Sequence, residues 1–122
     1  MRSHKDLNVW KLSIGFVSKI YRLTRELPAE EQYGLSSQMR RSAISIPSNI
    51  AEGAARNSSK EYMQFLYISL GSVAEIETQL DIAERLGYIA DTSALAKDLI
   101  EIRKMLLGLI AYVAKKKKNP KT

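Results

Sequence analysis

Apolar residues recur at spacings of three and four along most of the chain, which is typical of α-helices buried on one face. The pattern predicts a helix over about 7–27, ending before Pro28, and a second over about 31–56. A third extends from a capping box at Ser58–Glu61 to Gly87, and a fourth from Asp91 or Thr92 to Val113. Because the connections are short, we expect an all-α fold, an antiparallel up-down-up-down four-helix bundle.

The segment Ser45-Ile-Pro-Ser-Asn-Ile-Ala-Glu-Gly53 departs from ordinary helix preferences inside the second helix. Pro47 removes a backbone donor and costs roughly 3 kcal/mol in a helix interior, so we expect a kink there. Polar residues of this helix recur along one flank, and the third helix has a matching flank with Gly71 beside Ser72. Close backbone approach would explain Gly71. The pattern predicts a polar network or motif containing Ser45, Asn49, Glu52, Ser72 and Glu75. A ligand cleft at Asn49 and Glu52 is the alternative.

Two apolar stripes follow the first helix, separated by roughly 130° of rotation. One stripe, which includes Phe16 and Ile20, is expected to face the core. The second stripe would lie exposed unless a partner covers it, so it predicts an oligomer interface; it consists of Trp10, Ile14, Val17 and Tyr21. The alternative is that the bundle buries both stripes itself.

The chain of 122 residues predicts one domain over 1–114, followed by a basic, disordered tail over 115–122. It contains no cysteine, its N-terminus lacks the apolar stretch of a signal peptide, and its longest apolar run is too short to span a bilayer. A cytoplasmic location without membrane contact is therefore expected.

The formal net charge of +6 favours an acidic partner, most often nucleic acid. Lys11, Arg22 and Arg25 share an arc of the first helix that no acidic residue interrupts, and Arg40 and Arg41 are the next candidates for phosphate contacts. No base-reading motif occurs, and aromatic residues do not alternate with the basic ones, so readout of the backbone is expected. The alternatives are an ordinary solvated face or a scaffold for another protein.

The residues expected of an enzyme are missing from the sequence. The single histidine, His4, lies in the N-terminal tail, so neither a di-iron nor a zinc site has its ligands, and no glycine-rich phosphate loop occurs. We therefore expect no enzymatic activity, no catalytic residue, no metal and no cofactor.

Several short motifs occur in a fixed order along the chain. They are Trp10, Leu27-Pro28, Tyr33-Gly-Leu35, Gln38-Met-Arg-Arg-Ser-Ala43, the nonapeptide 45–53, Gly71-Ser-Val-Ala-Glu75 and Leu86-Gly-Tyr-Ile89. Over about residues 6–113 the chain resembles the bacterial four-helix-bundle family of 23S ribosomal RNA intervening-sequence proteins. That family is similar in fold to the accessory variability proteins of diversity-generating retroelements.

The resemblance implies a homopentameric barrel with a positive surface, association with RNA or DNA, and no catalytic activity. The retroelement relatives also partner a reverse transcriptase. We therefore expect a non-enzymatic oligomeric bundle that associates with nucleic acid mainly through phosphate contacts. The alternative is a scaffold or accessory subunit for a polymerase or another nucleic-acid enzyme.

Overall fold

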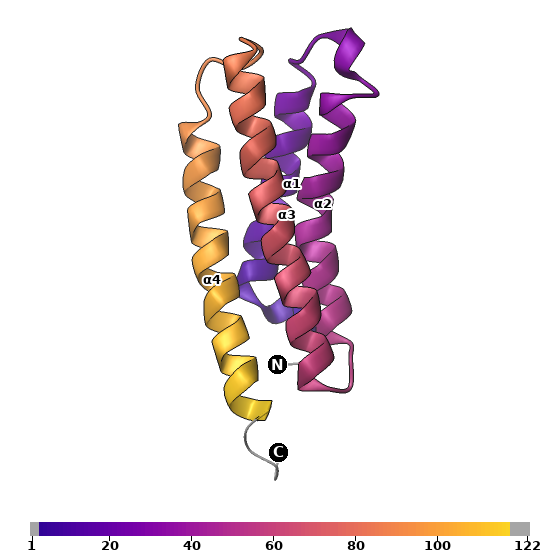
Figure 1. Ribbon diagram of the computed structural model, residues 1–122, viewed down its shortest axis with the longest axis vertical. Coiled ribbons are helices and arrows are strands. Elements are labelled where there is room, and N and C mark those ends of the chain that lie inside the picture. Colours follow the sequence, from indigo (N-terminus) through magenta and orange to yellow (C-terminus); the bar gives the residue numbers. More distant parts are fainter. Residues whose placement is uncertain (1–2, 118–122) are drawn as a thin grey trace.

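Four long helices lie side by side in the computed structural model, which describes residues 3–117 (Figure 1). They are α1 (Asn8–Thr24), α2 (Leu35–Ala54), α3 (Ser59–Arg85) and α4 (Ser93–Lys117), with short 3-10 turns η1 (His4–Asp6) and η2 (Ala29–Glu31). Residues 3–117 contain no strand. Each long helix packs against two others, in the cyclic order α1, α2, α3, α4. The α1–α2 and α3–α4 connections share one end of the molecule and the α2–α3 connection lies at the other, so consecutive helices are antiparallel (Figure 1).

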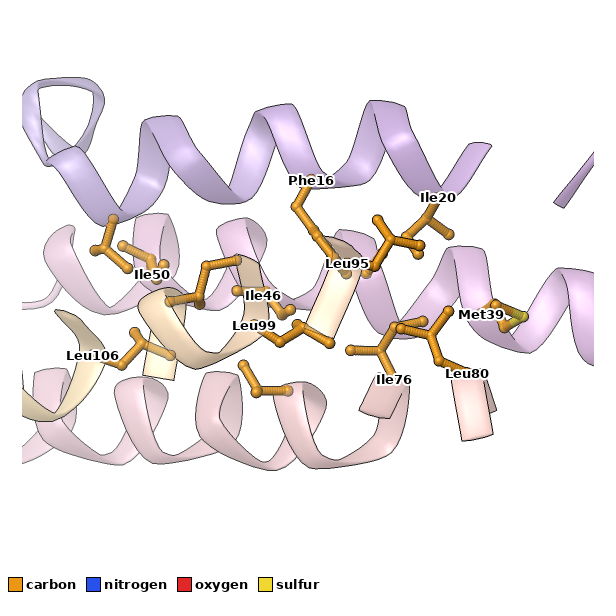
Figure 2. Packing of buried hydrophobic residues seen from close by; sticks show 14 of the residues in the cluster. Phe16, Ile20, Met39, Ile46, Ile50, Ile76, Leu80, Leu95, Leu99 and Leu106 are labelled. Carbon is orange, nitrogen blue, oxygen red and sulfur yellow. The ribbon is translucent and has the colours of Figure 1, made fainter. Parts of the chain in front are cut away.

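The core is a column of aliphatic side chains with one phenylalanine, contributed by all four helices. Figure 2 shows Phe16 and Ile20 of α1 pointing into the interior of the bundle, which they share with Met39, Ile46 and Ile50 of α2 and with residues of α3 and α4. Of the four helices, α2 and α3 share the most extensive contact. The predicted four-helix bundle is confirmed, and the predicted core stripe of α1 faces its interior.

Capping residues set the ends of α3 and the start of α4. The Ser58 hydroxyl accepts a hydrogen bond from the Glu61 amide at 3.2 Å, as expected at the start of α3. At the other end Gly87 has φ +78°, and the Tyr88 amide donates to the Ala83 carbonyl oxygen at 3.0 Å. This pair of features is the Schellman arrangement, which favours glycine because a side chain strains a positive φ. Asp91 Oδ1 accepts from the Ser93 amide at 2.9 Å, which lowers the pKa of Asp91.

The connection between α1 and α2 differs from the predicted boundaries. Helix α1 ends at Thr24 and α2 begins only at Leu35, because η2 and Gly34 separate them. Glu31 holds this corner: its Oε1 accepts from the Leu35 amide at 3.1 Å and its Oε2 accepts from the Tyr88 hydroxyl at 2.9 Å. One carboxylate therefore caps α2 and links the α1–α2 connection to the α3–α4 connection.

Helix α2 continues through Pro47 without interruption. The kink at Pro47 stays a prediction. Gly71 does not mark a close approach: a Cβ added there would meet nothing within 4 Å, which contradicts the explanation expected for it. The close approach between α2 and α3 lies at Gly53 instead. Nothing in the structure explains the glycine at position 71.

Helix α4 extends to Lys117, past the expected domain end at 114. The predicted disorder of the tail concerns residues 115–122, of which 118–122 lie outside the described residues. Within residues 3–117, no helix has the length and apolar character needed to cross a membrane.

Candidate nucleic-acid interface

Lys11, Arg22 and Arg25 all lie exposed on the outer side of α1. Among residues 3–117, no salt bridge joins any of the three to a carboxylate. Lys19, in contrast, donates to Asp98 Oδ2 at 2.7 Å and ties α1 to α4. Because a helix rises about 1.5 Å per residue, Lys11 and Arg25 lie roughly 21 Å apart along its axis. The row can therefore contact different phosphates of one nucleic acid.

Arg40 is held against the end of α1 rather than lying free. Its Nε donates to Thr24 Oγ1 at 2.8 Å, its Nη2 donates to the Tyr21 carbonyl oxygen at 3.4 Å, and its guanidinium lies 4.4 Å from the centre of the Tyr21 ring. A cation at a helix C-terminus is stabilised by the helix dipole, so this contact supports the α1–α2 packing. A guanidinium has five N–H groups, and these bonds leave donors on Arg40 for an external anion.

Two adjoining hollows join the cations of α1 to those of α2. One, of about 450 Å³, is lined by Arg40 and Arg41 together with the aromatic rings of Tyr21 and Tyr33. The other, of about 250 Å³, is lined by Arg25 and Arg40. Gln32 and Arg40 belong to both hollows. The two groups of arginines that the sequence suggested separately therefore meet at the α1–α2 end of the bundle.

Tyr33 is the residue at this corner that sequence reasoning missed. It precedes Gly34 at the start of α2, and its side chain is 91% exposed. Tyr21, which lies in the same hollow, belongs to α1 and had been assigned to an oligomer interface. Folding brings these rings to the arginines from separate elements. Their proximity is therefore not visible in the sequence, in which aromatic and basic residues do not alternate.

The predicted polar network between α2 and α3 exists for three of its five members. Ser72 Oγ donates to Ser45 Oγ at 2.7 Å, and Asn49 Nδ2 donates to the same Ser45 oxygen at 2.9 Å and to the Ser45 carbonyl oxygen at 2.8 Å. One turn away, Ser69 Oγ donates to the carbonyl oxygen of Ile46 at 2.9 Å. These bonds fix the register of α2 against α3.

Glu52 and Glu75 lie outside this network, and both are exposed. Glu52 Oε2 forms a salt bridge of 3.6 Å with Arg56 one turn later, and the Arg56 guanidinium lies 4.9 Å from the centre of the Phe65 ring. The expectation that these carboxylates complete a hydrogen-bonded network with Ser45 and Asn49 is therefore wrong. Asn49 directs its amide nitrogen at Ser45.

The second apolar stripe of α1 largely faces its own bundle. Trp10 and Val17 are half-buried and pack against the core, and Tyr21 is covered by Arg40. The edge of the Trp10 ring system also meets His4, with 5.1 Å between ring centres. Only Ile14 of the four is largely exposed, at 42%. The interface assigned to this stripe stays a prediction, and the structure offers little free apolar surface there.

Aliphatic residues that are more exposed than Ile14 lie on α4. Ile100 and Leu107 are 52% and 49% exposed, and they lie seven positions apart, so they share one face of the helix. A shallow hollow of about 570 Å³ lined by Gly108, Ala111 and Tyr112 continues the surface toward the C-terminus. This face was not singled out from the sequence, because the core residues of α4 dominate its periodicity.

The part of the chain that the structure describes contains no group of three or more histidine, cysteine, aspartate or glutamate side chains arranged to hold a metal ion. The features that remain are a half-buried polar contact between α2 and α3, an exposed aliphatic face on α4, and the basic corner, by which we mean Arg25, Arg40 and Arg41 around the two hollows. The molecule is thus a small antiparallel four-helix bundle in which Lys11, Arg22 and Arg25 form no salt bridge within residues 3–117.

Comparison with known proteins places this bundle in a family. The family model for the 23S rRNA-intervening sequence proteins matches residues 5–108, and the chain belongs to that family. Among solved structures, the chain is similar to a protein of unknown function from the S23 ribosomal protein family of Bacteroides thetaiotaomicron VPI-5482. The two share 30% identity over 84% of this chain and 97% of that chain, with a TM-score of 0.77. No curated protein matches the sequence.

Proposed function

We propose that this protein is a non-enzymatic, oligomeric bundle that associates with nucleic acid, chiefly by contacting the phosphate backbone. The observation that carries the proposal is the meeting of Arg25, Arg40 and Arg41 around two adjoining hollows at the end of α1. Lys11 and Arg22 extend the same positive surface along α1. The net charge of +6 adds a long-range attraction for a polyanion.

Phosphate contacts account for this geometry better than base readout does. The cations lie on a convex helix face and at the rims of shallow hollows, and both Arg22, in the last turn of α1, and Arg25, the residue that follows the helix, are exposed. Such side chains neutralise backbone charge and release counterions, which gives affinity without sequence preference. The family is named for a 23S rRNA intervening sequence and the structural neighbour belongs to a ribosomal protein family, which favours RNA as the partner.

The test is a binding titration of nuclease-treated protein against an RNA hairpin closed by a non-nucleotide linker, in which every nucleotide is paired, and a DNA duplex at several salt concentrations. The key variant replaces Lys11, Arg22 and Arg25 with glutamine. The matched control replaces Arg85, Lys97 and Lys104, three exposed cations of α3 and α4, so both variants lose the same charge. For the DNA duplex, we expect the slope of log affinity against log salt to fall by about 2 to 3 in the key variant and to change little in the control.

Two results would contradict the proposal. Equal weakening in both variants would mean that net charge, rather than this face, attracts the nucleic acid. Absence of binding by the unmodified protein at low salt would leave the basic surface as a determinant of solubility only.

A protein scaffold, including an accessory subunit for a polymerase, is the second candidate, and it would need a free apolar face such as that of Ile100 and Leu107 on α4. The occupant that we propose for this face is a second copy of the chain, because oligomers of identical subunits are the commonest way to cover an apolar face. A pull-down after nuclease treatment that recovers one stoichiometric partner protein, lost in Ile100→Asp, would favour the polymerase-type scaffold instead.

A further inference from the structure

The larger hollow of the basic corner combines two kinds of chemistry that backbone contacts alone do not require. Its volume of about 450 Å³ lies in the range of small-ligand sites. Arg40 and Arg41 supply positive charge, while Tyr33 and Ile44 supply apolar surface, and both of these side chains are exposed. A ligand that uses all of them has an anionic part and a flat, weakly polar part.

The Tyr33 ring is free to stack. Its side chain is 91% exposed, and no hydrogen bond, ion pair or ring contact involves its side chain within residues 3–117. It lies between Gln32, the C-cap residue of η2, and Gly34, whose amide donates to the Glu31 carbonyl oxygen at 3.0 Å, so the backbone that carries the ring is anchored. An exposed aromatic ring on a fixed backbone offers stacking area at low cost in conformational entropy.

Arg40 lines the hollow and is held in place by its contacts with α1. Its bonds to Thr24 and to the Tyr21 carbonyl oxygen fix the guanidinium. One face of the guanidinium plane lies on the Tyr21 ring, and that ring does not cover the other face. Arg41 is exposed one residue later. A planar guanidinium suits bidentate contact with a phosphate, and a second arginine beside it strengthens the attraction.

We propose that this hollow binds a single unpaired nucleotide, whose base stacks on Tyr33 and whose phosphate contacts Arg40 and Arg41. The inference rests on the proposed nucleic-acid function and narrows its substrate to strands with a bulge, loop or single-stranded end. A paired base inside a helix has both faces covered by its neighbours, whereas an unpaired base can leave the stack and place a face on a protein ring. The stacking is tolerant of base identity because every base has a π face.

The experiment compares two RNA hairpins, each closed by a non-nucleotide linker in place of a loop, that differ only in one bulged nucleotide, a fluorescent adenine analogue. We expect the unmodified protein to bind the bulged hairpin roughly 5- to 100-fold more tightly than the paired one, and to quench the analogue. Tyr33→Ala should abolish the quenching and remove the difference in affinity between the two hairpins. Tyr33→Phe, which keeps the ring, should retain both effects. Tyr67→Ala, which removes another exposed tyrosine on α3, is the matched control and should behave as the unmodified protein.

The outcomes separate this inference from the proposed function. Equal binding of the two hairpins, or a preference that survives in Tyr33→Ala, overturns the nucleotide site while the α1 face still accounts for binding. If neither hairpin binds at low salt, both proposals fail. If an acidic peptide displaces the bulged hairpin and itself loses affinity in Tyr33→Ala, the hollow is a peptide site and the inference is overturned.

Discussion

Gly53 of α2 lies so close to Phe65 of α3 that a Cβ added to the glycine would stand 2.9 Å from the Cβ of Phe65. The same added atom would lie 3.1 Å from the Tyr62 carbonyl oxygen, which belongs to the backbone and cannot rotate away. The Ser45–Ser72 bond lies two turns earlier along α2. The last residue of the nonapeptide is therefore a glycine because the two helices meet there.

Gly53→Ala should destabilise the protein, and Gly71→Ala should not. Overpacking costs about 1–3 kcal/mol, and the preference of a helix for alanine over glycine offsets roughly 1 kcal/mol of that. At Gly71 the added methyl meets nothing within 4 Å, so only the helical gain remains. Urea unfolding of both variants measures the difference. The same sign for the two changes would refute the close approach at Gly53.

Adjacent leucines of α4 provide a second matched pair. Leu106 is fully buried and Leu107 is 49% exposed, although they are neighbours with the same side chain. Leu106→Ala should lower the free energy of unfolding by about 2–5 kcal/mol, because it leaves a cavity in the core. Leu107→Ala should change it by less than about 0.5 kcal/mol in the monomer. Similar losses at both positions would mean that Leu107 is covered, as in an assembly.

Much of the fold could be predicted from local patterns, because helices leave a period and their ends leave capping residues. Gly87 and Ser58 both occupy the predicted capping positions. The periodicity fixes the angle between two stripes of one helix, but it does not say how widely a neighbouring helix wraps around it. That is why Trp10 and Val17, predicted to lie outside the bundle, pack against its core.

The candidate site was only partly predictable. Exposed cations such as Arg22 and Arg25 are visible as an uninterrupted arc of one helix. The contact of Arg40 with Tyr21 and Thr24 joins two helices through tertiary packing, and no local pattern encodes it. Tyr33 belongs to the motif Tyr33-Gly-Leu35, but nothing in the sequence marked it as a binding residue, because a single tyrosine before a helix is ordinary until its exposure and its neighbours are known.

The serine pair between α2 and α3 should show measurable coupling. A double-mutant cycle with Ser45→Ala and Ser72→Ala should give an interaction energy of about 0.5–1.5 kcal/mol, because either single change leaves a polar partner without its hydrogen bond. The control cycle pairs Ser45→Ala with Glu75→Ala, whose exposed side chain takes no part in the network, and should be additive within about 0.5 kcal/mol. Coupling of equal size in both cycles would contradict the contact as described.

The Tyr88–Glu31 bond should make stability depend on pH in the alkaline range. The hydrogen bond to Glu31, then burial and the negative charges of Glu31 and Glu30, raise the pKa of Tyr88 above its ordinary value of 10.0. A raised pKa in the folded state gives stability that is fully present below about pH 10 and is lost as the pH rises through the folded pKa. Burial also raises the pKa of Tyr62, which acts in the same direction.

Unfolding free energies of the unmodified protein and Tyr88→Phe, measured from neutral pH upward, isolate the Tyr88 contribution because Tyr62 is common to both. The difference between the two proteins should be constant below about pH 10 and should shrink above it. A difference in unfolding free energy that stays constant across the whole pH range would mean that the hydrogen bond from the Tyr88 hydroxyl to Glu31 does not contribute to stability.

Self-association should depend on α4 more than on the second stripe of α1. Ile100→Asp combined with Leu107→Asp places charges on the exposed aliphatic face, so we expect smaller particles by light scattering with unchanged helical content. Ile14→Asp places a charge at the only largely exposed member of the α1 stripe and should have a weaker effect. Trp10→Asp should instead destabilise the subunit itself, because Trp10 packs against the core. If Ile14→Asp alone dissociates the assembly while the α4 variant remains assembled, the interface lies on α1 as the sequence pattern first indicated.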